Sequence, residues 1–191
     1  MMKKLFPVIM LAVLLVVSGQ ILAQEAKEGE APAMPPMGPP EEMKQMAFLV
    51  GTWDYTMKMK MNPADTNWMD TKGTATYEMA YGGAAIRSTI EQQLMGQSFI
   101  GGDLTSYDRD AKKWQSVWID NMGAKLTMFN GTKTADGMVL EGQELMNGMP
   151  TITRMTSYNM TPTTYDWKGE VSMDNGKTWM TWGTAKYIKR Q

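Results

Sequence analysis

From Gly51 onward, apolar and polar side chains alternate along the chain with a period of two residues. Trp53, Tyr55, Met57 and Met59 are separated from one another by single polar residues. Successive side chains of a β-strand point to opposite faces, so this pattern predicts a strand with one buried and one solvated face. The alternation recurs almost to the C-terminus, and no helical pattern interrupts it. The chain is therefore predicted to be all-β.

Ten segments show this strand pattern, and each is followed within a few residues by a turn signal. They cover residues 51–61, 72–81, 85–95, 97–107, 114–120, 125–130, 138–145, 151–158, 163–173 and 179–189. Short sequential connections make neighbouring strands antiparallel. A sheet of this size usually closes on itself, because closure removes its exposed edges. We predict a closed antiparallel up-and-down barrel of about ten strands, with a two-sheet sandwich as the alternative.

The first 23 residues have the layout of a secretory signal peptide. Lys3 and Lys4 precede an apolar run over residues 5–17, and a small residue, Ala23, stands at the expected cleavage site. The run is shorter than the roughly 20 residues that a membrane-spanning helix needs. These features predict a periplasmic or secreted protein with no stable membrane insertion once the signal peptide is removed.

Two further segments precede the first strand. Residues 24–40 hold five of the nine prolines and are predicted to be a disordered spacer. Residues 41–49 are predicted to form a short helix in which Met43, Met46 and Ala47 share one face. The globular domain is thus expected to span residues 41–191.

The composition removes most familiar catalytic machinery. The sequence contains no cysteine and no histidine, which excludes disulfides, thiol nucleophiles, Ser-His-Asp triads and Cys- or His-based metal sites. A formal net charge of −1 gives no electrostatic basis for nucleic-acid binding. No catalytic residue and no cofactor are predicted from the sequence.

Several short motifs occur in a fixed order along the domain. They are Gly51-Thr52-Trp53, Tyr81-Gly82-Gly83 followed by Arg87, Tyr107 before a polar turn, and Trp118-Ile119-Asp120 followed by Gly123. This set resembles the exported bacterial domain-of-unknown-function family 1579, and the glycine–tryptophan opening resembles lipocalin-like (calycin) barrels. The resemblance implies a closed barrel with an interior pocket and no established activity. It also implies a basic residue of the last strand over Trp53, for which Lys186, Lys189 and Arg190 are the candidates.

Methionine is unusually frequent, at 22 residues. Because methionine is a flexible apolar filler, its abundance favours a barrel interior that adapts to apolar ligands. We therefore predict an exported binding protein for a small apolar or amphipathic molecule. The residues expected to bind that molecule are Trp53, Tyr55, Met57 and Met59 on the cavity wall, with Arg87, Asp120 and Arg154 as polar anchors.

Two alternatives stay open at this point. Met57, Met59 and Met61 place three thioethers on one strand face, and thioethers suit Cu(I), so the protein is alternatively a periplasmic soft-metal binder. The second alternative is a barrel enzyme that uses an inward arginine and a carboxylate such as Glu91 or Asp120. Separately, Ser172–Trp179 matches the Asp-box motif of β-hairpins, for which a turn-stabilising role is expected.

Overall fold

A computed structural model describes residues 37–191. The predicted signal peptide and most of the predicted spacer lie outside the described residues. The described part contains ten strands, which match the predicted segments closely. They are β1 (Gly51–Met59), β2 (Met69–Ala80), β3 (Ala85–Leu94), β4 (Gln97–Asp108), β5 (Lys113–Asp120), β6 (Thr127–Lys133), β7 (Met138–Met146), β8 (Met149–Tyr158), β9 (Thr164–Ser172) and β10 (Met180–Lys189).

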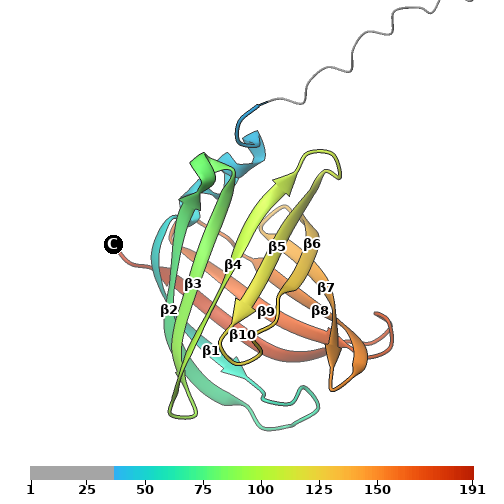
Figure 1. Ribbon diagram of the computed structural model, residues 1–191. Helices are drawn as coiled ribbons and strands as arrows, with labels where there is room; N and C mark the ends of the chain where they lie inside the picture. The colour runs from blue at the N-terminus through green and yellow to red at the C-terminus, as the bar shows by residue number, and fades with distance from the viewer. Residues whose placement is uncertain (1–36) are drawn as a thin grey trace, which may run out of the picture. The chain divides into compact units, whose positions relative to one another are not determined.

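Each strand pairs antiparallel with the next, and β1 pairs with β10 to complete a closed barrel. Figure 1 shows the up-and-down course of the strands around the barrel. The closing pair places Trp53 opposite Lys189 and Tyr55 opposite Tyr187. The predicted closed barrel is confirmed, and the two-sheet sandwich is wrong.

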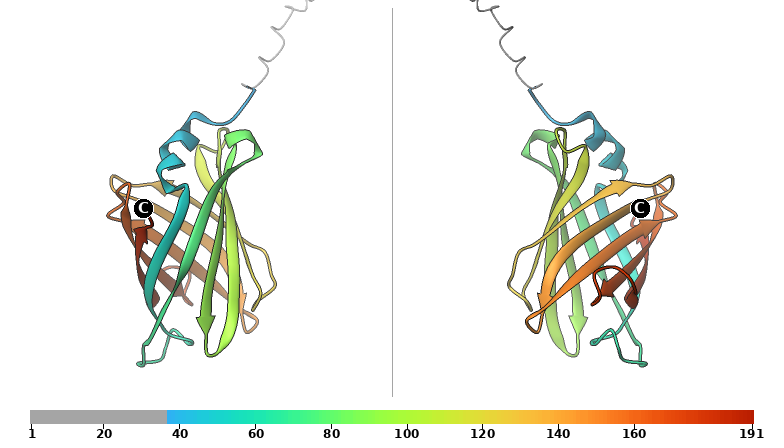
Figure 2. Two further views of the ribbon diagram at one scale, coloured as in Figure 1. Left: turned by 90° about the vertical axis from the view of Figure 1, so that its left-hand side faces the viewer. Right: turned by 90° about the vertical axis from the view of Figure 1, so that its right-hand side faces the viewer.

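A short helix, η1 (Glu41–Leu49), lies across one end of the barrel (Figures 1 and 2). It is a 3₁₀ helix, which has three residues per turn, so Met43, Met46 and Leu49 share its buried face. The prediction of Ala47 on that face was wrong, because it assumed the wider turn of an α-helix, and Ala47 is exposed. A second 3₁₀ turn, η2 (Tyr81–Gly83), connects β2 to β3.

The hairpin turns follow their sequence signals with one exception. Asn147–Gly148 forms a two-residue hairpin turn with positive φ at both residues, as such turns require. Asn175–Gly176 also has positive φ at both residues, within the longer connection between β9 and β10. Gly131 was predicted to begin a turn but lies inside β6, which continues to Lys133. A Cβ at Gly131 would lie 1.8 Å from the Val139 carbonyl oxygen, so this glycine permits close approach of β6 and β7.

The buried core cluster includes the apolar face of the helix and the fully buried Trp53. Its indole Nε1 donates a hydrogen bond to the Leu49 carbonyl at 2.7 Å, which ties β1 to the end of η1. Its ring meets Tyr165 edge-on at 5.2 Å. Lys189 Nζ lies 5.5 Å from the ring centroid and donates to the Phe48 carbonyl, so Lys189 is the basic cover of Trp53.

The Asp-box segment forms the hairpin between β9 and β10. Asp174 accepts hydrogen bonds from the Thr178 amide, the Thr178 hydroxyl and the Ser172 hydroxyl, and these lower the pKa of its carboxyl to about 2. Trp179 donates to the Gly176 carbonyl at 3.1 Å. The motif holds a turn together, as predicted.

Among the described residues, no helix has the length and apolar character needed to cross a membrane.

Candidate functional site: the barrel lumen

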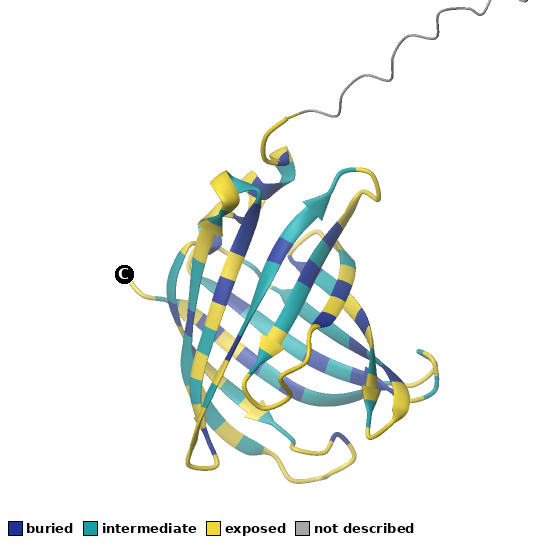
Figure 3. Ribbon diagram, in the orientation of Figure 1, coloured by how far each residue is buried: buried dark blue, intermediate teal, exposed yellow. Residues whose placement is uncertain are grey.

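The barrel encloses a cavity of about 490 Å³ that reaches from η1 to the loops at the opposite end. Buried and exposed residues alternate along the strands, as Figure 3 shows, so one side of each strand faces this lumen. The volume falls in the range of roughly 300–1,000 Å³ typical of small-molecule sites. Other hollows lie on the outer wall, for example beside Lys58, Asp70 and Lys72, and have a charged border.

The cavity wall is mainly apolar. Nine methionines and nine aromatic residues border it, and they come from strands around the barrel, from η1 and from the connecting loops. Tyr55, Met57 and Met59 are on this wall, as their shared strand face predicted. Trp53 lies on the same strand face but is sealed beneath the helix, so it supports one end of the cavity rather than lining it. The prediction that Trp53 lies on the cavity wall was therefore wrong, and the ligand-binding roles of Tyr55, Met57 and Met59 stay predictions.

Two of the predicted polar anchors point away from the lumen. Arg87 is exposed on β3 and pairs with Glu78 at 2.7 Å, and Arg154 on β8 pairs with Glu141 at 2.6 Å. Arg154 also lies over the ring of Trp179, 3.6 Å from its centroid. The prediction that these arginines anchor a ligand in the lumen was therefore wrong.

The arginine–carboxylate pair of the enzyme alternative is not formed in the described barrel either. No arginine borders the cavity in the described part of the chain, and Glu91 is exposed on the outer side of β3. An inward arginine–carboxylate pair is thus absent from the described barrel interior.

Asp120 lies at the open end of the cavity, but its carboxylate holds a turn. It accepts hydrogen bonds from Trp118 Nε1 at 2.8 Å, from the Met122 amide at 2.9 Å and from the Gly123 amide at 2.6 Å. Burial raises the pKa of Asp120, but these hydrogen bonds outweigh burial and the pKa is lowered overall. Its oxygens are engaged within the protein, so the structure gives Asp120 a positioning role at the mouth.

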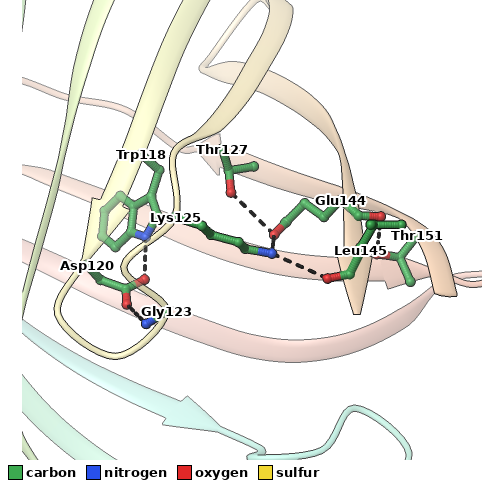
Figure 4. A network of polar contacts seen from close by, with 8 residues as sticks. All are labelled: Trp118, Asp120, Gly123, Lys125, Thr127, Glu144, Leu145 and Thr151. Carbon is green, nitrogen blue, oxygen red and sulfur yellow. Dashed lines mark hydrogen bonds and ion pairs between the residues drawn. The ribbon is translucent and has the colours of Figure 1, made fainter. Parts of the chain in front are cut away.

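A second polar contact at the mouth links β7 to the loop before β6. Lys125 Nζ lies 2.7 Å from Glu144 Oε2, and Thr127 donates to the same carboxylate. Figure 4 shows this contact beside the Trp118–Asp120 pair. The mouth is therefore polar and charge-paired, whereas the wall behind it is apolar.

One carboxylate inside the lumen is not among the predicted site residues. Asp103 on β4 borders the cavity and accepts hydrogen bonds from the hydroxyls of Ser88, Thr105 and Ser116. These three donors are buried. The available signal was strand parity, because Asp103 and Thr105 lie an even number of residues from Phe99, which also borders the cavity.

Four tyrosines, Tyr55, Tyr77, Tyr165 and Tyr187, border the same lumen. The rings of Tyr165 and Tyr187 stack at 4.2 Å, and the hydroxyls of Tyr77 and Tyr165 are 2.6 Å apart. Tyr55 packs against Tyr187 at 4.9 Å. Burial raises the pKa of all four phenols well above the ordinary value.

The metal alternative gains little from the structure. Met57, Met59 and Met61 all border the cavity. In residues 37–191, however, no group of three or more acidic side chains gathers to hold a metal ion, and the sequence has no histidine or cysteine to complete a thioether site. None of the comparisons below adds support for metal binding.

Comparison with known proteins supports the fold. A family model described as "Protein of unknown function (DUF1579)" matches residues 38–189. A search of curated proteins finds no significant match. Among solved structures, Rv2717c from M. tuberculosis is similar with a TM-score of 0.57 and 10% identity, over 81% of this chain and 100% of that one.

The S-type phycobiliprotein lyase CPES from Guillardia theta is similar with a TM-score of 0.55 and 11% identity. That match covers 78% of this chain and 92% of the lyase chain. At these identities the likeness establishes a shared barrel fold and nothing further about ligands.

Proposed function

Because the chain belongs to the DUF1579 family, whose function is unknown, we propose a function from its cavity: the barrel binds a small apolar or amphipathic molecule in its lumen. The enclosed 490 Å³ cavity with its methionine and aromatic wall carries this proposal. A barrel of about eight or more strands has room for one such ligand. Flexible thioethers let the wall repack around an irregular apolar shape.

The polar mouth supports the same function. The charged side chains at the opening already have protein partners: Lys125 pairs with Glu144, and Asp120 accepts a hydrogen bond from Trp118. They therefore make the opening polar without adding unpaired charge there. This division between a paired polar rim and an apolar interior is typical of small-molecule sites.

Filling the lumen is expected to weaken binding strongly without unfolding the barrel. Ile90 on β3 borders the cavity, and Ile90→Trp adds a large ring to that space. We expect at least a tenfold weaker affinity for the fluorescent apolar probe N-phenyl-1-naphthylamine, with an overpacking cost of about 1–3 kcal/mol. Fluorescence titration measures the affinity, and circular dichroism checks the fold.

The matched control is Ile188→Trp on β10, where the side chain is 53% exposed on the outer wall. This variant should bind the probe as the unaltered protein does. Equal weakening by both substitutions, or none by Ile90→Trp, would place the probe outside the lumen.

We further propose that the protein acts outside the cytoplasm, in the periplasm or after secretion. Support comes from the sequence alone, from Lys3 and Lys4, the apolar run over residues 5–17 and Ala23. Intact-mass analysis of the protein from its own cells is expected to give a chain that begins at Gln24. A chain that retains Met1 would contradict cleavage.

A further inference from the structure

Asp103 is a charged group in an unusual place for a β-barrel, on the inner wall of an apolar lumen. A Cβ at the preceding Gly102 would lie 2.3 Å from the Ser88 carbonyl oxygen, so this glycine lets β3 and β4 approach closely. The close approach brings the Ser88 hydroxyl against Asp103, whose own amide donates back to Ser88 Oγ at 3.0 Å. The fold therefore holds the carboxylate in a fixed position.

The partners of Asp103 are neutral. The Thr105 hydroxyl donates a hydrogen bond to Asp103 Oδ2 at 2.5 Å, and the Ser116 hydroxyl donates to the same oxygen at 3.1 Å. The Ser88 hydroxyl donates to Oδ1. Hydroxyls satisfy lone pairs but leave the negative charge uncompensated. In residues 37–191, no ion pair involves Asp103.

The lysines that border the cavity have other partners at its mouth. Lys125 pairs with Glu144 at 2.7 Å, and Lys60 lies over the ring of Trp68, 4.8 Å from its centroid. Figure 4 shows Lys125 held between Glu144 and the Leu145 carbonyl. Neither cation therefore reaches inward to neutralise the carboxylate.

The surroundings of Asp103 suit a positive charge. Tyr77, Tyr165 and Tyr187 border the same cavity as Asp103, whose negative charge adds to the effect of burial in raising their pKa. Tyrosine rings attract cations through their negative faces. A charge in an apolar enclosure is stabilised most by an opposite charge that also donates hydrogen bonds.

We propose that the lumen selects a cationic amphiphile, whose protonated amine head binds Asp103 and whose apolar body lies along the methionine and aromatic wall. This inference rests on the proposed ligand-binding function and specifies the ligand class. An ammonium group replaces the missing counter-charge and forms a charge-assisted hydrogen bond. A fatty-acid carboxylate is disfavoured at the same position by like-charge repulsion.

Three probes with the same ten-carbon chain separate head-group effects from apolar burial: decylamine, decanol and decanoate. At pH 7, displacement of N-phenyl-1-naphthylamine is expected to show decylamine binding at least tenfold more tightly than decanol, with decanoate weakest. Asp103→Asn keeps the shape and one of the two acceptor oxygens, and it removes the negative charge. It should bring decylamine to about the affinity of decanol and leave decanol unchanged.

The matched control is Asp70→Asn on β2, where the carboxylate is 78% exposed and pairs with Lys58 on the outer wall. It should preserve the preference for decylamine. Equal affinities of the unaltered protein for decylamine and decanol would overturn the inference while leaving ligand binding intact, and this comparison holds even where Asp103→Asn does not fold. Failure of all three probes and of the dye would overturn the proposed function itself.

Discussion

Replacing Trp53 with alanine is expected to lower the free energy of unfolding by about 3–5 kcal/mol, the range for a fully buried large aromatic residue. Trp53 has 0% exposure, so the substitution removes its apolar contacts and leaves a cavity. It also removes the hydrogen bond to Leu49, the edge-on contact with Tyr165 and the cation–π contact with Lys189. Urea denaturation measures the change.

Trp68→Ala is the matched control, because Trp68 is 42% exposed in the loop between β1 and β2. Its contact with Lys60 is solvated, so we expect a change within about 0.5 kcal/mol. A loss below about 1 kcal/mol for Trp53→Ala, or equal losses for both variants, would mean that Trp53 does not hold the helix-capped end together.

Raising the pH above 10 is expected to destabilise the barrel steeply through its buried tyrosines. Burial holds the pKa of Tyr165 and Tyr187 well above the ordinary value in the folded state, and these residues are 4% and 6% exposed. Above pH 10 the unfolded chain releases these protons and the folded barrel keeps them. The free energy of unfolding therefore falls as pH rises, until the folded-state pKa values are reached.

Each such tyrosine contributes about 1.4 kcal/mol per pH unit, so the pair contributes about 3 kcal/mol per unit. Denaturation curves between pH 10.5 and 12, where the unfolded phenols are mostly ionised, should approach this slope as the difference between the unaltered protein and a Tyr165→Phe/Tyr187→Phe variant. Lysine titration is common to both proteins and cancels in that difference. Identical slopes would show that the two phenols ionise equally well in the folded protein.

The fold was predictable because its information lies in hydrophobic periodicity. Trp53, Tyr55, Met57 and Met59 mark one strand face without ambiguity, and turn pairs such as Asn147–Gly148 set the strand boundaries. Three residues of the last strand were candidates for the basic side chain over Trp53. The register of β1 and β10 places Lys189 opposite Trp53, and Lys189 is the residue that lies over the ring. That register depends on how the first and last strands pair in the folded barrel, which sequence periodicity does not predict.

The polar part of the site was harder to predict, because a charged residue in a strand can point either into the lumen or outward. Only its position relative to the apolar residues of the same strand decides between the two faces. Arg87 and Glu91 alternate with Ile86 and Ile90, which places them outside, and Arg154 lies beside Thr153, which faces the lumen. Asp103 was not predicted to face the lumen, because Gly101 and Gly102 interrupt the apolar pattern of its strand. Its significance depends on the hydroxyls of β3 and β5, which only the folded barrel brings to it.

The most direct test of the lumen as a ligand site is native mass spectrometry of the protein purified from its own cells. We expect a folded species heavier than the polypeptide by the mass of one small molecule, and release of that molecule on denaturation. The Ile90→Trp variant, prepared in the same way, should carry none. A folded protein with only the polypeptide mass, together with no uptake of apolar or amphipathic probes, would contradict a ligand-holding lumen.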